Sequence, residues 1–180
     1  MCVSTMVDYL PVAVASRSIW EISAMDKMTL VLQTLDELDN YIPRFSVNNE
    51  KVSKWAVGMQ IEHCLLVTRI ICNGIANSKP YTGKIKKGLI RRIIFLTGII
   101  PRGRGKAPDA FMPNEETTES GLRELLAEAK LSVQRGAESD QDSWCKHFAF
   151  GVLKRDEALR IVEIHSKHHL KIISDILSNA

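Results

Sequence analysis

The chain has 180 residues and a formal net charge of +3, and 45% of its residues are hydrophobic and 25% charged. This composition is typical of a globular protein, and the length favours one domain that buries about 70% of the surface its unfolded chain exposes. No apolar run is long enough to span a bilayer, and four cysteines without Cys-x-x-Cys spacing exclude a disulfide scaffold. We therefore expect a cytoplasmic protein with free thiols.

The first half of the chain predicts two long helices. Residues 1–22 show no clear periodicity and are expected to form an N-terminal extension to a single domain at 23–180. Within that domain, apolar residues recur at heptad-like spacing over 26–41, and Pro43 follows them. The second helix is predicted at 55–77, where a turn-forming sequence follows.

The second half predicts two more main helices. A short apolar and basic helix is expected at 84–96, followed by a Pro/Gly-rich loop at 101–117. Apolar periodicity then predicts helices at 118–135 and 155–177, and no segment is predicted to be a strand. Four main amphipathic helices indicate an all-α four-helix bundle, with the short basic helix and the long loop inserted between main helices 2 and 3.

Three of the five histidines lie at the centre of otherwise apolar helix faces. An ideal helix advances about 100° per residue, so positions i and i+4 share a face. By this projection His165 and His169 share the apolar face of the last helix, and His63 is central on that of the second. His168 lies on the flank of the stripe, near the polar boundary.

The second helix also carries apolar residues away from the His63 face, including Ile61 and Leu65. This helix is therefore expected to be covered on more than one side. Ile61, Leu65 and Leu30 of the first helix also offer a face for a homodimer. Scattered exposed apolar residues are the plainer explanation.

The three inward-facing histidines have two interpretations. A buried histidine is usually a core residue that hydrogen-bonds to a neighbour. An i,i+4 pair, however, presents two imidazoles to one point, and a third from another helix completes a metal-binding set. Neither stripe supplies a carboxylate, so a bound metal would keep a position for water or substrate, as in catalytic sites. His63, His165 and His169 are the candidate metal ligands.

A basic segment separates the second and third main helices. It contains eight basic residues and no acidic one: Lys84, Lys86, Lys87, Arg91, Arg92, Arg102, Arg104 and Lys106. Such a cluster attracts a carboxylate, a phosphate, an acidic partner or a membrane surface, and the plainer interpretation is a solvated helix face plus a loop. Its Gly/Arg-rich part is too short for an RNA-binding tail and lacks aromatic residues, so no nucleic-acid partner is expected.

Two motifs resemble the DinB/YfiT-like superfamily of metalloenzymes. One is the histidine of Gln-Ile-Glu-His at 60–63 together with His-Ser-Lys-His-His at 165–169. The other is His-Phe-Ala-Phe-Gly-Val-Leu at 147–153, which is similar to the His-Pro-x-Phe-Gly-x-Leu segment before the last helix in one uncharacterised branch, with Phe148 where proline is usual. The resemblance covers about residues 26–180 and implies a four-helix bundle of the DinB/YfiT type.

The resemblance also implies a metal and a thiol. In that superfamily nickel, zinc or iron is held by one histidine of the second helix and the outer two of His-x-x-x-His. The matching residues here are His63, His165 and His169, which leaves His168 outside the ligand set. Several members are similar to transferases or isomerases that use a low-molecular-weight thiol, and many others have no known activity.

The main functional hypothesis is a metal-dependent thiol S-transferase, or a related lyase or isomerase, acting on a small-molecule substrate. An open metal position would bind the thiol and lower its pKa. No catalytic residue is assigned. Gln60 is a candidate for orienting the site, although a solvated glutamine on the helix flank is the plainer interpretation. Arg102 and Arg104, and their neighbours Arg91 and Arg92, are candidates for binding carboxylates of thiol or substrate.

Two alternatives belong to other classes. In the first, the chain is a stress-response or binding module whose metal is structural or vestigial and whose basic segment docks an acidic partner. In the second, the protein binds no metal, and the three histidines are hydrogen-bonded core residues. The sequence leaves the metal, the thiol and the substrate open, because a three-imidazole site accepts several first-row ions.

Overall fold

The computed structural model describes residues 19–103, 108–114 and 116–178, with side chains from residue 26 onward. Four long helices in this part of the chain are α1 (Ile19–Asp39), α2 (Val57–Ala76), α4 (Glu119–Glu138) and α5 (Arg155–Ser178). The shorter elements are η1 (Ile42–Arg44), α3 (Leu89–Thr97), η2 (Asp109–Phe111), β1 (Trp144–His147) and β2 (Gly151–Lys154).

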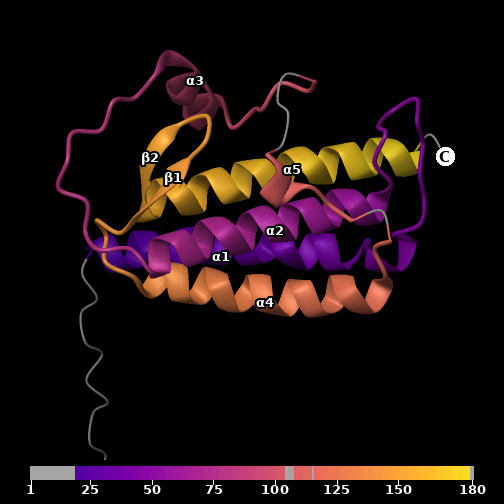
Figure 1. Cartoon of the computed structure of the whole chain (residues 1–180), viewed down its shortest axis with the longest axis horizontal. Coiled ribbons are helices and arrows are strands. Elements are labelled where there is room, and N and C mark those ends of the chain that lie inside the picture. The colour runs from indigo at the N-terminus through magenta and orange to yellow at the C-terminus, as the bar shows by residue number, and fades with distance from the viewer. Residues whose placement is uncertain (1–18, 104–107, 115, 179–180) are drawn as a thin grey trace, which may run out of the picture.

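The four long helices lie side by side, with α3 and the β1–β2 hairpin at one end of α5 (Figure 1). Helix α2 packs against α4 and α5, and α1 packs against the same two helices, so the four share one apolar core. The predicted mostly helical architecture is confirmed. No helix in the described residues has both the length and the apolar character needed to cross a bilayer.

The long helices begin and end where their local sequence favours it. Thr118 caps α4 by accepting a hydrogen bond from the backbone N–H of Gly121, which satisfies one of the free donors at the helix start. Four apolar residues at helical spacing then face the core: Leu122, Leu126, Ala129 and Val133.

Two helix starts differ from the sequence prediction. Helix α1 begins at Ile19, within the predicted extension 1–22, since no glycine or proline separates Ile19 from the periodic segment. Helix α3 begins later than predicted, at Leu89, after the helix-disfavouring Gly88. It ends at Thr97, and the next residue, Gly98, has a φ of 67° that suits a residue without a side chain.

The prediction that the chain contains no strand is wrong. Strands β1 and β2 form an antiparallel hairpin in which Cys145 pairs with Leu153. Each strand has only four residues, too few to give a clear alternating pattern. The turn depends on Gly151, with φ of 71°, and on His147 Nδ1, which accepts from the backbone N–H groups of Ala149 and Phe150.

Arg91 fixes this hairpin to α3 and α5. Its side chain is only 3% exposed and donates hydrogen bonds to the carbonyl oxygens of Phe150, at 3.1 Å, and Val152, at 2.8 Å. The guanidinium also lies 2.6 Å from a carboxylate oxygen of Glu157. Arg91 is therefore a structural residue, and its charge is already balanced without a substrate carboxylate.

Replacing Arg91 with methionine is expected to lower the free energy of unfolding by about 2–4 kcal/mol, because two carbonyls and the Glu157 carboxylate lose a buried donor. Arg92→Met is the matched control, since Arg92 is the exposed neighbour on the same helix, and its expected effect is within about 0.5 kcal/mol. Urea unfolding of both variants measures the difference. Equal, small effects would contradict the structural role of Arg91.

The suggested dimer face on α2 is wrong. Ile61 and Leu65 are completely buried in the core, and only Leu30 of the three suggested residues is exposed. Their burial follows from the position of α2, which contacts α4, α5 and β1. The expectation that this helix is covered on more than one side is confirmed.

Candidate metal centre

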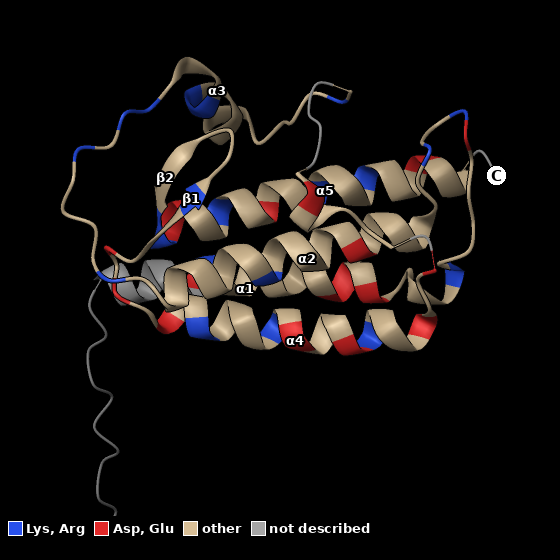
Figure 2. Ribbon diagram, viewed as in Figure 1, with Lys and Arg blue, Asp and Glu red and all other residues tan. Residues whose placement is uncertain are grey.

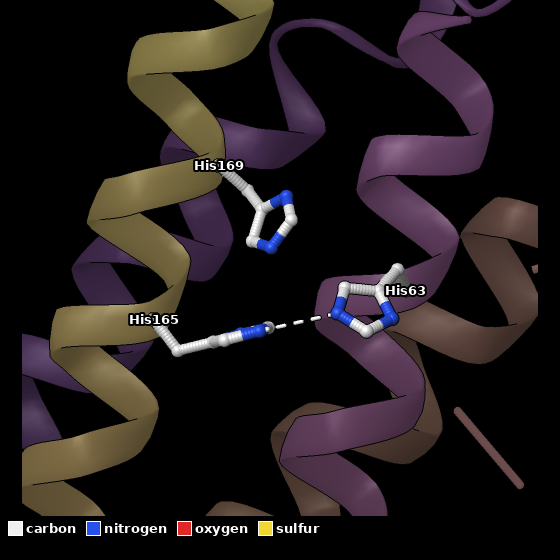
Figure 3. A group of neighbouring side chains, drawn as sticks. All are labelled: His63, His165 and His169. Carbon is white, nitrogen blue, oxygen red and sulfur yellow. Dashed lines mark hydrogen bonds between the residues drawn. The ribbon is translucent and has the colours of Figure 1, made fainter. Parts of the chain in front are cut away.

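The three predicted histidines meet between α2 and α5. His63 lies in the first half of α2, and His165 and His169 are one turn apart on α5, with all three rings turned toward one point (Figure 3). One ligand nitrogen from each ring lies within 4.8 Å of the other two. No carboxylate belongs to this group within the described residues, so the centre is a set of three imidazoles.

A backbone carbonyl sets the orientation of His63. The His63 Nδ1–H donates to the carbonyl oxygen of Phe111 at 2.6 Å. The other ring nitrogen, Nε2, is therefore unprotonated, and its lone pair is directed at the other two rings. The preceding residue, Glu62, holds the same loop by accepting from the backbone N–H of Asn114 and the hydroxyl of Thr117. Glu62 therefore holds the loop whose Phe111 carbonyl orients the His63 ring.

Gln60 orients His169 in the same way. The His169 Nδ1–H donates to Gln60 Oε1 at 2.6 Å, and Gln60 Nε2 donates to Ser53 Oγ at 2.9 Å. The side chain is only 2% exposed, so the interpretation of Gln60 as a solvated residue is wrong. It is buried because the loop before α2, which carries Ser53, covers this side of the helix. His169 is left with Nε2 as its free lone pair.

His165 is held differently. Its Nε2 lies 3.2 Å from His63 Nε2, and its Nδ1 is buried without a hydrogen-bond partner. Because His63 already donates through Nδ1, the proton shared by the two Nε2 atoms belongs to His165 when no metal is bound. For His165 to bind a metal through Nε2, this proton would move to Nδ1, which has no hydrogen-bond partner among the described residues.

The nitrogen spacing fits a metal coordination shell. In a tetrahedral site with metal–nitrogen bonds of about 2.0–2.1 Å, two nitrogen ligands lie about 3.3–3.4 Å apart. The separation of 3.2 Å between His63 Nε2 and His165 Nε2 is close to this value. An oxygen acceptor on the second nitrogen, which His63 and His169 both have, is also typical of metal-bound histidines.

Burial keeps the three imidazoles neutral. The pKa of His165 and of His169 is well below the ordinary value of 6.5, chiefly because burial disfavours the charged ring and then because the rings face one another. Burial also lowers the pKa of His63, although its hydrogen bond to Phe111 opposes this change. Neutral imidazole is the form that binds a metal, so protons do not compete with a cation near neutral pH.

The other proposed residues lie outside this set. His168 is half-buried and its ring lies 5.1 Å from that of His169, but it hydrogen-bonds to the backbone of Ile100 and is not one of the three converging ligands. Arg102 is paired with Asp175 at 2.6 Å near the surface, and its charge lowers the pKa of His168. Arg104 lies outside the described residues.

Sequence reasoning missed the groups that surround the triad. The Phe111 carbonyl and the Ser53 hydroxyl come from loops, where no periodic pattern indicates which side chains meet. The Trp55 ring lies 5.1 Å from that of His63 and forms part of the wall. Its only signal was its position just before α2.

The cysteines in the described residues are separate from the centre. Cys64, Cys72 and Cys145 are free and buried. Burial raises the pKa of all three thiols, to about 12 for Cys72 and about 11 for Cys145. Such thiols remain protonated at neutral pH and are poor nucleophiles, so none of these three is a candidate reactive thiol.

Replacing Gln60 with leucine is expected to weaken metal binding about 10–100-fold, because His169 loses the acceptor that fixes its tautomer. Gln60→Glu keeps an oxygen acceptor at the same place and is expected to bind metal more tightly than Gln60→Leu. Competition with a chromogenic chelator measures both affinities. If the two variants bind metal equally well, Gln60 does not orient the site.

Comparison with known proteins identifies a family. The family model described as protein of unknown function DUF1569 matches residues 24–175. No curated protein and no solved structure gave a significant match. Because the family model spans most of the chain, this protein belongs to the DUF1569 family.

Proposed function

We propose that this protein is a metal-dependent enzyme of the DinB/YfiT type, with one divalent nickel, zinc or iron ion held by His63, His165 and His169. The observation that carries the proposal is the convergence of three neutral imidazoles, two of which are fixed by oxygen acceptors on their far nitrogens. Such outer acceptors orient histidines for metals and raise their basicity.

The surrounding residues support a reactive rather than a closed site. A structural zinc site normally has four protein ligands, whereas three leave a position for water or substrate. When bound, the metal would supply a Lewis acid that lowers the pKa of a water or thiol on its open position. Phe111 and Gln60 keep two imidazoles in one tautomer, and Trp55 and the 108–114 segment cover His63, which is only 5% exposed.

A low-molecular-weight thiol is the proposed co-substrate, in a transferase, lyase or isomerase reaction. The resemblance to thiol-dependent enzymes supports it, and so does the burial of Cys64, Cys72 and Cys145, which makes a protein nucleophile from these residues unfavourable. Arg102 is the proposed partner for a carboxylate of that thiol, and it would exchange its exposed ion pair with Asp175 for this purpose.

The test uses metal-loaded protein and a panel of thiols: glutathione, bacillithiol, mycothiol and coenzyme A. We expect one of them to be consumed with an electrophile such as 1-chloro-2,4-dinitrobenzene, and the activity to disappear on chelation and in His169→Ala. Arg102→Ala is expected to raise the KM for that thiol and leave kcat nearly unchanged.

A different outcome would change the assignment. If the protein binds one metal ion but shows neither turnover nor metal-dependent thiol binding, the proposed enzyme activity is contradicted. The protein would then be a binding module with a structural metal. Turnover that survives chelation would contradict the role of the metal.

A further inference from the structure

Helix α3 packs against the β1–β2 hairpin through a face that carries a buried arginine. Successive residues advance about 100° around a helix, so Arg91, Ile94 and Phe95 share one side of α3. Arg91 and Ile94 are buried there, and Phe95 contacts Phe150 of the hairpin at a ring separation of 6.3 Å. A charged residue therefore occupies the inner face of this helix.

The outward face of α3 is apolar. Leu89, Ile90 and Leu96 are 71–87% exposed, and Ile93 lies between them on the same side. These four residues, which we call the α3 apolar face, form a continuous stripe on a helix that projects from the bundle (Figure 1). Contiguous exposed apolar residues of this kind mark an interaction site, since a solvated helix normally turns polar residues outward.

Basic residues surround this face. The segment leading into α3 and α3 itself carry lysine and arginine but no acidic residue (Figure 2). Lys87 is paired with Glu157, whereas Lys84, Lys86 and Arg92 are exposed and have no ion pair among the described residues. A hollow of about 480 Å³ beside the face is lined partly by Lys86, Leu89 and Ile90, so cationic and apolar groups meet in one place.

We propose that the α3 apolar face docks on an anionic lipid surface, with Leu89, Ile90, Ile93 and Leu96 entering the headgroup boundary and Lys84, Lys86 and Arg92 contacting lipid phosphates. An amphipathic helix with leucine on one face and lysine or arginine beside it binds membranes in this manner. A second copy of the chain fits less well, because a twofold interface would place this basic region against itself.

Co-flotation of the full-length protein with vesicles tests the proposal. We expect binding to vesicles of phosphatidylcholine with phosphatidylglycerol, weaker binding to phosphatidylcholine alone, and release as salt increases. Leu96→Asp is expected to reduce the partition coefficient at least about tenfold. Changing Lys84, Lys86 and Arg92 to glutamine is expected to reduce it about 100-fold, at about fivefold per charge.

Leu131→Asp is the matched control, because Leu131 is an exposed leucine on α4, away from this face, and should bind vesicles like the wild type. All the altered residues are exposed, so circular dichroism should show unchanged folding. Absence of binding to anionic vesicles would overturn the proposal. A wild-type dimer that Leu96→Asp converts to monomer, without vesicle binding, would assign the face to a protein interface instead.

Discussion

Replacing His63, His165 or His169 with alanine is expected to remove stoichiometric metal from the protein. Each variant leaves only two imidazoles, and the structure places no carboxylate of the described residues in the group that could replace the third. The loss of affinity should exceed the roughly 10–100-fold that is typical when only an outer hydrogen-bond partner of a ligand is removed. Metal analysis after dialysis, together with chelator competition, measures the effect.

His168→Ala is the matched control for these variants. His168 is adjacent to a proposed ligand on α5 but hydrogen-bonds to the backbone of Ile100, and it should retain one metal ion per chain. Circular dichroism separates metal loss from unfolding. The site would be wrongly assigned if His168→Ala lost the metal, or if all three of the other variants kept it.

Metal-free protein is expected to lose much of its stability between pH 7 and pH 5. All five histidines have a folded-state pKa below 6.5, chiefly because of burial, so the unfolded chain binds more protons than the folded one as the pH falls. The free energy of unfolding is therefore complete above about pH 7 and decreases below it. His165 and His169, whose pKa values lie well below 6.5, both contribute to this decrease.

Urea unfolding at the two pH values measures this loss, and a metal-saturated sample is the control. Because a bound metal requires deprotonated imidazoles, saturation should move the loss of stability to lower pH. His147, which is not one of the proposed ligands and has its pKa lowered to about 4, should go on contributing below pH 5 in both samples. Equal stability of the metal-free protein at pH 7 and pH 5 would contradict the burial of neutral histidines.

The histidine cluster could be predicted because helical periodicity determines which residues share a face. His165 and His169 are four residues apart, and His63 is surrounded by apolar positions, so both stripes had to turn their histidines inward. Periodicity cannot say what loops place over a helix. Gln60 was expected to be solvated, because periodicity gives no sign that the loop carrying Ser53 covers it. The Phe111 carbonyl likewise comes from a segment without a regular pattern.

The region around α3 shows a second limit of periodicity. The sequence predicts an apolar and basic helix here, and apolar residues on such a helix normally face the core. Arg91 instead takes the inner position, because the hairpin supplies carbonyl oxygens and α5 supplies Glu157. The hairpin has strands too short to be predicted, so the outward direction of Leu89 and Leu96 could not be predicted either.

Metal analysis of the purified wild-type protein tests the central claim most directly. Protein purified without chelator, and protein stripped and then titrated with nickel, zinc or iron(II), should contain or take up one ion per chain and gain thermal stability on binding. A chain that contains no metal, takes up none of the three ions and unfolds at the same temperature with and without them would contradict the account.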